Sequence, residues 1–207
     1  MNKLVFFCAL LSAPFISCAA DTVTKVTEIP SDFKSVDAVI PIFSQKLGFR
    51  LPTSWKIASQ KRKPGLFSVE FSPNNEDIKS WKNLLTIQGF ENLSSKVTAE
   101  QFLSVSSLSF RTVCSKDFVF ENLGQTTIDG FVAHRAIMGC NKVPNQQYGE
   151  IAYWLIIQGE KDLYSIQKAI RSETEITLSK KNVDTFFSDF TPIQLCKLDG
   201  TQYECKK

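Results

Sequence analysis

One apolar stretch, residues 149–170, constrains the fold of this chain more than any other part. Its letters, GEIAYWLIIQGEKDLYSIQKAI, divide into two apolar runs, 150–158 and 163–170, around the polar turn 159–162. Two runs rich in aliphatic and aromatic residues around a polar turn predict a β-hairpin. Both faces of the first strand are apolar at period two. We therefore expect the hairpin to lie in the middle of a sheet that is covered on both sides.

Two amphipathic segments predict helices that cover this sheet. Thr98 and Gln101 match a capping box at the start of the first helix. Its apolar stripe consists of Ala99, Phe102, Leu103, Phe110 and Val113. The second helix is capped by Ser179, and its apolar residues recur at helical spacing. These are Val183, Phe186, Phe187 and Phe190. We expect Trp154 to face one helical layer and Tyr153 the other.

The remaining elements follow from alternation and turn signals. Asp129-Gly130 is a strong two-residue hairpin signal between two further strands. A short helix over 32–46 carries Phe33, Val36, Val39 and Ile40 on one side, and Pro41 ends or kinks it. The predicted strands are 47–51, 55–60, 66–71, 81–90, 117–128, 131–143, 150–158 and 163–170. This order predicts an α+β fold, an α/β/α sandwich in which an antiparallel sheet of six to eight strands is flanked by two or three helices.

The N-terminus has the pattern of a secretory signal peptide over residues 1–20. Lys3 precedes a short apolar run, and small residues precede a cleavage point after Ala19 or Ala20. A lipoprotein signal that acylates Cys18 is a less favoured alternative, and a buried N-terminal helix is less favoured still. Residues 21–46 then form an N-terminal segment, and residues 47–207 form a single domain. No later segment is long and apolar enough to cross a membrane.

Four cysteines remain after the signal peptide: Cys114, Cys140, Cys196 and Cys205. An even number of cysteines in an exported chain predicts two disulfides. Three pairings are open, and we favour 114–140 with 196–205, since a hairpin around 199–202 would bring the last two cysteines together. The alternative, a zinc site, lacks a C-x-x-C motif and has only one histidine in the chain, so we expect no metal.

Neither composition nor motifs indicate an enzyme. The net charge of +3 falls to +2 without Lys3, which gives no argument for a nucleic-acid partner. His134, the single histidine, is expected to be a packed or surface residue. Ser165 and Lys168 match S-x-x-K, but in a strand they face opposite sides. The chain has no phosphate-binding loop, dinucleotide fingerprint or H-E-x-x-H motif, so we predict no catalytic residue and no cofactor.

The pattern of elements resembles the PsbP-like superfamily. The resemblance rests on segment 49–52 with Trp55, on segment 81–88, and on the helix and hairpins that follow them. This superfamily includes the photosystem protein PsbP, the Mog-type Ran-binding proteins and small exported bacterial proteins, to which the chain looks closest. The resemblance covers about residues 47–205. It implies an α/β/α sandwich and a role in binding or stabilising other proteins, and it supplies no active-site residues.

We therefore expect an exported protein, periplasmic or secreted, that acts as a non-enzymatic binding or accessory factor of the cell envelope. Its partner would be another envelope or secreted protein. The alternatives are a small-ligand or lipid carrier, with an apolar cavity under helix 183–190, and a hydrolase, with a cleft around His134. The candidate binding residues are Lys61, Arg62 and Lys63 in the basic turn 61–65, although a solvated hairpin tip is the favoured interpretation of that turn. We also expect loop 144–149 to contribute.

Overall fold

The computed structural model describes residues 33–198 and residue 205. The chain divides into two compact units, Met1–Pro30 and Ser31–Lys207, and every described residue belongs to the second. The predicted signal peptide and Cys18 lie outside the described residues.

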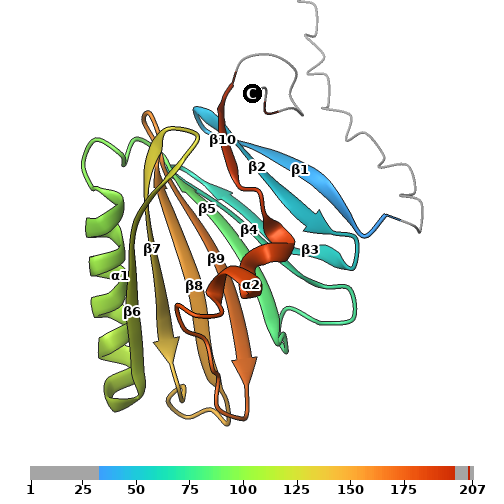
Figure 1. Ribbon diagram of the computed structural model, residues 1–207, viewed down its shortest axis with the longest axis vertical. Coiled ribbons are helices and arrows are strands. Elements are labelled where there is room, and N and C mark those ends of the chain that lie inside the picture. The colour runs from blue at the N-terminus through green and yellow to red at the C-terminus, as the bar shows by residue number, and fades with distance from the viewer. Residues whose placement is uncertain (1–32, 199–204, 206–207) are drawn as a thin grey trace, which may run out of the picture. The chain divides into compact units, whose positions relative to one another are not determined.

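The centre of the fold is a seven-stranded antiparallel sheet in the order β3-β4-β5-β9-β8-β7-β6 (Figure 1). Its strands are β3 Trp55–Lys63, β4 Leu66–Pro73, β5 Asn83–Phe90, β6 Phe118–Ile128, β7 Phe131–Cys140, β8 Gly149–Gln158 and β9 Leu163–Ser172. The predicted central hairpin is confirmed as β8 and β9, which both lie inside the sheet. The predicted Asp129-Gly130 turn joins β6 to β7, and both residues have the positive φ that a tight hairpin turn requires.

A second, three-stranded sheet corrects the prediction for the N-terminal segment. It has the order β1-β2-β10, with β1 Ser35–Ile42, β2 Gln45–Pro52 and β10 Gln194–Lys197. The helix predicted over 32–46 is therefore wrong, because this β-branched segment pairs along its whole length with β2. Pro41 is tolerated because β1 is an edge strand. The folded unit thus begins before residue 47.

The first helix, α1 Ala99–Cys114, has the predicted capping box, in which Gln101 N donates to Thr98 Oγ1 and Thr98 N donates to Gln101 Oε1. Ala99 and Leu103 are buried, and Phe102 and Phe110 pack at the edge of the same core. Val113 does not belong to the buried stripe, since it is 59% exposed. The helix packs chiefly on β7, with smaller contacts to β8 and β6, so only a narrow stripe is covered.

The second helix is shorter than predicted. It comprises α2 Val183–Phe187, followed by a 3-10 turn, Ser188–Phe190. Ser179 is not its N-cap, because residues 179–182 form a turn of their own in which Ser179 N donates to Asn182 Oδ1. Phe187 and Phe190 are nonetheless buried as the apolar spacing predicted.

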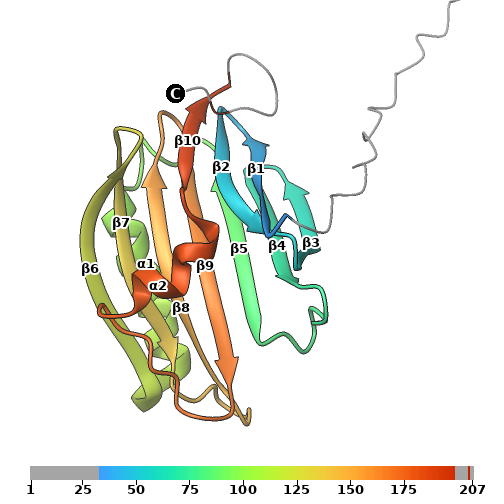
Figure 2. The same cartoon turned by 45° about the vertical axis from the view of Figure 1, so that its right-hand side comes forward.

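The seven-stranded sheet separates two apolar cores (Figure 2). The larger core lies between this sheet and a layer made of the small sheet and α2, where the Tyr153 and Phe187 rings are 4.8 Å apart. The smaller core lies under α1, where the Trp154 and Phe110 rings are 5.8 Å apart. Trp154 and Tyr153 therefore face the two sides as predicted. The predicted sandwich is only roughly matched, since one outer layer combines strands with a five-residue helix.

Two disulfides join the predicted pairs. Cys114, at the end of α1, is bonded to Cys140, at the end of β7, with a Cα–Cα distance of 5.2 Å. Cys196 of β10 is bonded to Cys205, with a Cα–Cα distance of 5.4 Å. The strand partner of β10 is β2. The hairpin predicted around 199–202 lies outside the described residues.

Candidate functional site

A group of polar and aromatic side chains lies on the α1 side of the seven-stranded sheet. Because α1 packs chiefly over β6–β8, it leaves much of β9, β5 and β4 uncovered, and two adjoining hollows lie there. The outer hollow has a volume of about 510 Å³ and the inner hollow about 310 Å³. Trp81 and Arg171 line both, so we call the two together the groove. The outer hollow is also lined by Lys79, Lys82, Tyr148 and Glu173, and the inner by Glu70, Thr86, Gln88, Glu150, Trp154 and Gln167.

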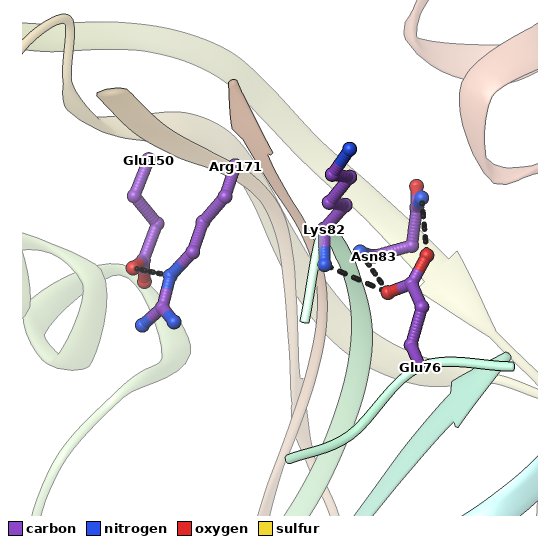
Figure 3. Close-up of polar contacts among 5 residues, drawn as sticks. All are labelled: Glu76, Lys82, Asn83, Glu150 and Arg171. Atoms are coloured by element: carbon purple, nitrogen blue, oxygen red, sulfur yellow. Dashed lines mark hydrogen bonds and ion pairs between the residues drawn. The ribbon is translucent and has the colours of Figure 1, made fainter. Parts of the chain in front are cut away.

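Arg171 lies where the two hollows meet. Its guanidinium carbon is 3.7 Å from the centroid of the Trp81 ring and 4.9 Å from that of Tyr148, distances typical of cation–π contacts. Its Nε donates a hydrogen bond of 2.8 Å to Glu150 Oε2 (Figure 3). The side chains of Arg171 and Glu150 are 22% and 30% exposed. The guanidinium is therefore held by three side chains but still reaches solvent.

The register of the central hairpin brings this arrangement together. Glu150 and Arg171 are directly opposite in the β8–β9 ladder. Trp81 lies two residues before β5, and Arg171 N donates to Lys82 O at the point where β5 begins to pair with β9. Tyr148 comes from the loop that enters β8. Three segments distant in sequence thus meet at one end of the inner strands.

Glu76 fixes the lysine-bearing rim of the groove. Its Oε2 accepts hydrogen bonds of 2.7 Å from Lys82 N and 2.9 Å from Asn83 N (Figure 3). Asp77 Oδ1 likewise accepts from Lys79 N at 2.8 Å. Since both acids bind backbone N–H groups, they shape the loop, and Figure 3 shows the Lys82 side chain extending away from Glu76. Lys79 and Lys82 are exposed at the rim.

The groove contains hydrogen-bond donors that have no acceptor. Within residues 33–198 and residue 205, the two terminal nitrogens of Arg171 make no hydrogen bond. Trp154 is 7% exposed, and its Nε1 is buried without a partner in the described part of the chain. A buried N–H without an acceptor destabilises a protein by ~1–3 kcal/mol. Among the described residues, Gln45 Nε2 and Arg135 Nε are also buried without a partner and lie outside the groove, so an unpaired buried donor does not by itself mark a ligand site. The terminal nitrogens of Arg171 reach solvent and are open to an external acceptor.

The groups with clearly shifted pKa values lie outside the groove. Burial opposes ionisation of Asp162, but hydrogen bonds from Ser44 and Asn92 outweigh it and lower the pKa of this carboxyl. Burial lowers the pKa of Lys168, whose Nζ donates to Phe186 O beneath α2. Burial also raises the pKa of Tyr153, to about 12, and that of Tyr164. These four groups belong to the larger core and its turns.

The predicted binding residues Lys61, Arg62 and Lys63 lie apart from the groove. Lys61, Arg62 and Lys63 lie on β3 and not in the turn, because the strand continues to Lys63 and only Pro64 and Gly65 make the turn. All three are exposed and lie outside the groove, and Arg62 stacks on Phe67 with its guanidinium carbon 4.9 Å from the ring centroid.

Other predicted positions have mixed outcomes. His134 is half-buried on β7 and lines neither the groove nor the hollow beside α2. Ser165 and Lys168 face opposite sides of β9, as predicted. Tyr148 of loop 144–149 lines the outer hollow of the groove. Sequence reasoning missed Trp81, Glu150 and Arg171, although the predicted hairpin register itself would have placed Glu150 opposite Arg171.

A third hollow of about 350 Å³ lies beside α2. Its lining mixes apolar side chains such as Ile176 and Phe186 with polar ones such as Glu175 and Asn182. This volume is at the lower end of the range for small-ligand sites. Within the described residues, no three acidic, cysteine or histidine side chains are placed to hold a metal ion, and neither helix has the length and hydropathy of a membrane span.

Architecturally, the chain is an α+β protein built on an antiparallel sheet. No known family and no characterised protein sequence matches it. Similar solved structures include the Ran-binding protein Mog1p of Saccharomyces cerevisiae, with a TM-score of 0.43, 11% identity and coverage of 76% of this chain and 86% of that one. PsbP of Synechocystis sp. PCC 6803 has a TM-score of 0.40 and 17% identity, with coverage of 72% of this chain and 88% of that one. A Mog1 mutant has a TM-score of 0.42 and 10% identity, with coverage of 74% of this chain and 84% of that one. Both groups that the sequence resembles are represented among these structures, and at these TM-scores the similarity carries no argument.

Proposed function

We propose that this chain is a non-enzymatic binding protein that holds a segment of another exported protein in the groove. The observation that carries the proposal is Arg171, which is packed against Trp81 and Tyr148 while its terminal nitrogens remain unpaired. Arg, Trp and Tyr are the residues most enriched among those that dominate the energy of protein interfaces. Here they are held in place by the sheet before any partner arrives, which reduces the entropy lost on binding.

Two sequence features support an exported location. Residues 1–20 have the pattern of a signal peptide. Both disulfides would be reduced in an ordinary cytosol, so they fit a periplasmic or secreted protein. Acylation at Cys18 remains the alternative, in which the chain would work at a membrane surface.

The chemistry of the groove favours a polypeptide over a lipid. Its inner hollow mixes amides, carboxylates, a guanidinium and a hydroxyl with apolar side chains such as Leu84, Phe110 and Met138, whereas a lipid carrier needs a largely apolar cavity. Polypeptide backbone supplies both donors and acceptors, which suits the side chains of Gln88 and Gln167.

Site-specific photo-cross-linking in the producing cell tests this function. A photoreactive phenylalanine analogue is placed at Tyr148, in the groove, or at Ile57, an exposed residue of β3 outside it. We expect a discrete adduct with another exported protein from position 148 and none from position 57. Mass spectrometry identifies the partner, and the purified partner should bind the unmodified protein. Equal adducts from both positions, or none from position 148, would contradict the proposal.

A further inference from the structure

We propose that the segment held in the groove is acidic, with an Asp or Glu carboxylate bound by the two terminal nitrogens of Arg171. This inference rests on the proposed protein-binding function and specifies the chemical class of the partner. It follows from the way in which the guanidinium is already used. Glu150 occupies Nε only, and the rings of Trp81 and Tyr148 pack against the group. The edge that remains is the one that binds a carboxylate through two parallel hydrogen bonds.

Charge around the outer hollow agrees with an acidic ligand. Lys79, Lys82 and Arg171 line it against a single acid, Glu173. The nearby acids Glu76 and Asp77 bind backbone N–H groups and leave the lysine head groups exposed. The lining of the outer hollow therefore carries more basic than acidic side chains, although Glu150 pairs with Arg171 and the carboxylates of Glu76 and Asp77 lie beside the rim.

The same site disfavours a phosphate or another doubly charged anion. Glu150 is hydrogen-bonded to the guanidinium that would receive the ligand, and Glu70 lines the adjoining inner hollow. Two further negative charges next to these carboxylates would be repelled more strongly than one. A carboxylate carries one charge shared over two oxygens, so it matches the fork of donors and is repelled less by these acids.

The inner hollow has the features needed to hold the backbone beside such a carboxylate. Gln167 Nε2 donates to Gln88 Oε1 at 3.2 Å and to Ser165 Oγ at 2.9 Å, so this row of side chains already exchanges hydrogen bonds across the sheet. Trp154 lines the same hollow, but its Nε1 is fully enclosed and is not exposed to a ligand there.

Peptide display provides the test. Random linear peptides, fused through their C-termini so that only side chains supply carboxylates, are selected on the disulfide-bonded mature protein. We expect the selected peptides to be enriched in Asp and Glu. In synthetic peptides with both termini blocked, replacing the critical Glu by Gln should weaken binding about tenfold or more, as should Arg171→Gln in the protein. The two losses should not add in a double-mutant cycle, because each removes the same contact.

Matched variants separate this contact from general effects. Arg135→Gln changes another half-buried arginine of the same sheet, paired with Asp184, and should leave affinity unchanged. Lys79→Gln with Lys82→Gln alters only exposed rim residues. It should weaken binding about threefold and reduce its salt dependence. If Arg171→Gln lowers the melting temperature, the double variant Lys79→Gln with Lys82→Gln and the variant Arg171→Lys replace it in the affinity measurements.

The outcomes distinguish the partner class from the function. The acidic assignment is overturned if the selected peptides are not enriched in Asp and Glu, or if they bind Arg171→Gln as tightly as the unmodified protein. In either case the binding function still stands if position 148 gives cross-links. If no peptide is selected but position 148 still gives cross-links, the assignment of a linear acidic segment is overturned and the binding function stands. Absence of both peptides and cross-links overturns both proposals.

Discussion

The carboxylate of Asp162 is almost fully buried, at 1% exposure, in the turn between β8 and β9. It accepts hydrogen bonds from the backbone and hydroxyl of Ser44 and from the backbone of Asn92. Tyr164 OH also donates to Asp162 Oδ2, at 3.4 Å. One side chain therefore joins the turn after β1, the turn after β5 and the central hairpin.

We predict that Asp162→Asn lowers the free energy of unfolding by about 3 kcal/mol at pH 7, because it weakens charge-assisted hydrogen bonds in a buried site. Its folded-state pKa lies below the usual value, so the native carboxylate contributes stability above about pH 4 and loses it as pH falls further. Urea unfolding of both proteins should thus show a difference that is constant near neutrality and shrinks in acid.

Asp184→Asn is the matched control for this measurement. The Asp184 side chain is 89% exposed, and its nearest Arg135 nitrogen is 3.8 Å away. Its replacement should change stability by less than about 0.5 kcal/mol. An Asp162→Asn protein as stable as this control would show that the buried carboxylate does not hold the turns together.

At the scale of elements, the sequence predicted what depends on local pattern. The β8–β9 and β6–β7 hairpins and the α1 cap follow from turn residues, alternation and the Thr98–Gln101 box. The small sheet could not be predicted, because β1 owes its conformation to pairing with β2 and the spacing of Val36, Val39 and Ile40 fits a helix as well as a strand. The groove depends on which strands α1 leaves uncovered, which no local pattern encodes.

The Cys114–Cys140 disulfide ties the end of α1 to the end of β7, the strand on which the helix chiefly packs. Replacing both cysteines by alanine should lower the free energy of unfolding by about 3.5 kcal/mol, from the chain entropy of the opened loop. Cys196→Ala with Cys205→Ala opens a shorter loop and should cost about 2.7 kcal/mol. Equal urea midpoints for the Cys114/Cys140 variant and the unmodified protein would mean that this bond adds nothing to stability.

For the whole molecule, the position of β1 makes the N-terminal boundary of the fold testable. Ile42 is completely buried, and a Cβ added at Gly89 would lie 2.3 Å from its Cγ2. Gln45 is also completely buried, and its side chain accepts a hydrogen bond from Glu160 N. Strand β1 and the turn after it are thus part of the larger core.

A chain that starts at residue 31 should melt at the same temperature as one that starts at residue 21, whereas one that starts at residue 47 should be insoluble or melt about 10 °C lower or more. The second chain loses β1, the Ser44 bonds to Asp162 and the buried Gln45. Circular dichroism of both chains at equal concentration measures the difference. Similar melting of the two would restore the boundary at residue 47.

The half-covered sheet has a consequence for how such a chain can evolve. Along β4, β5 and β9, one set of alternate side chains fills the larger core, whereas Glu70, Gln88 and Gln167 belong to the groove. These three side chains are only partly buried and belong to neither core, so substitutions at them can accumulate with little effect on folding, unlike substitutions at Leu84, Leu163 or Ala169 on the same face. A lineage that carries this architecture could therefore change the chemistry of the groove at a few positions, while selection on the opposite face keeps the scaffold constant.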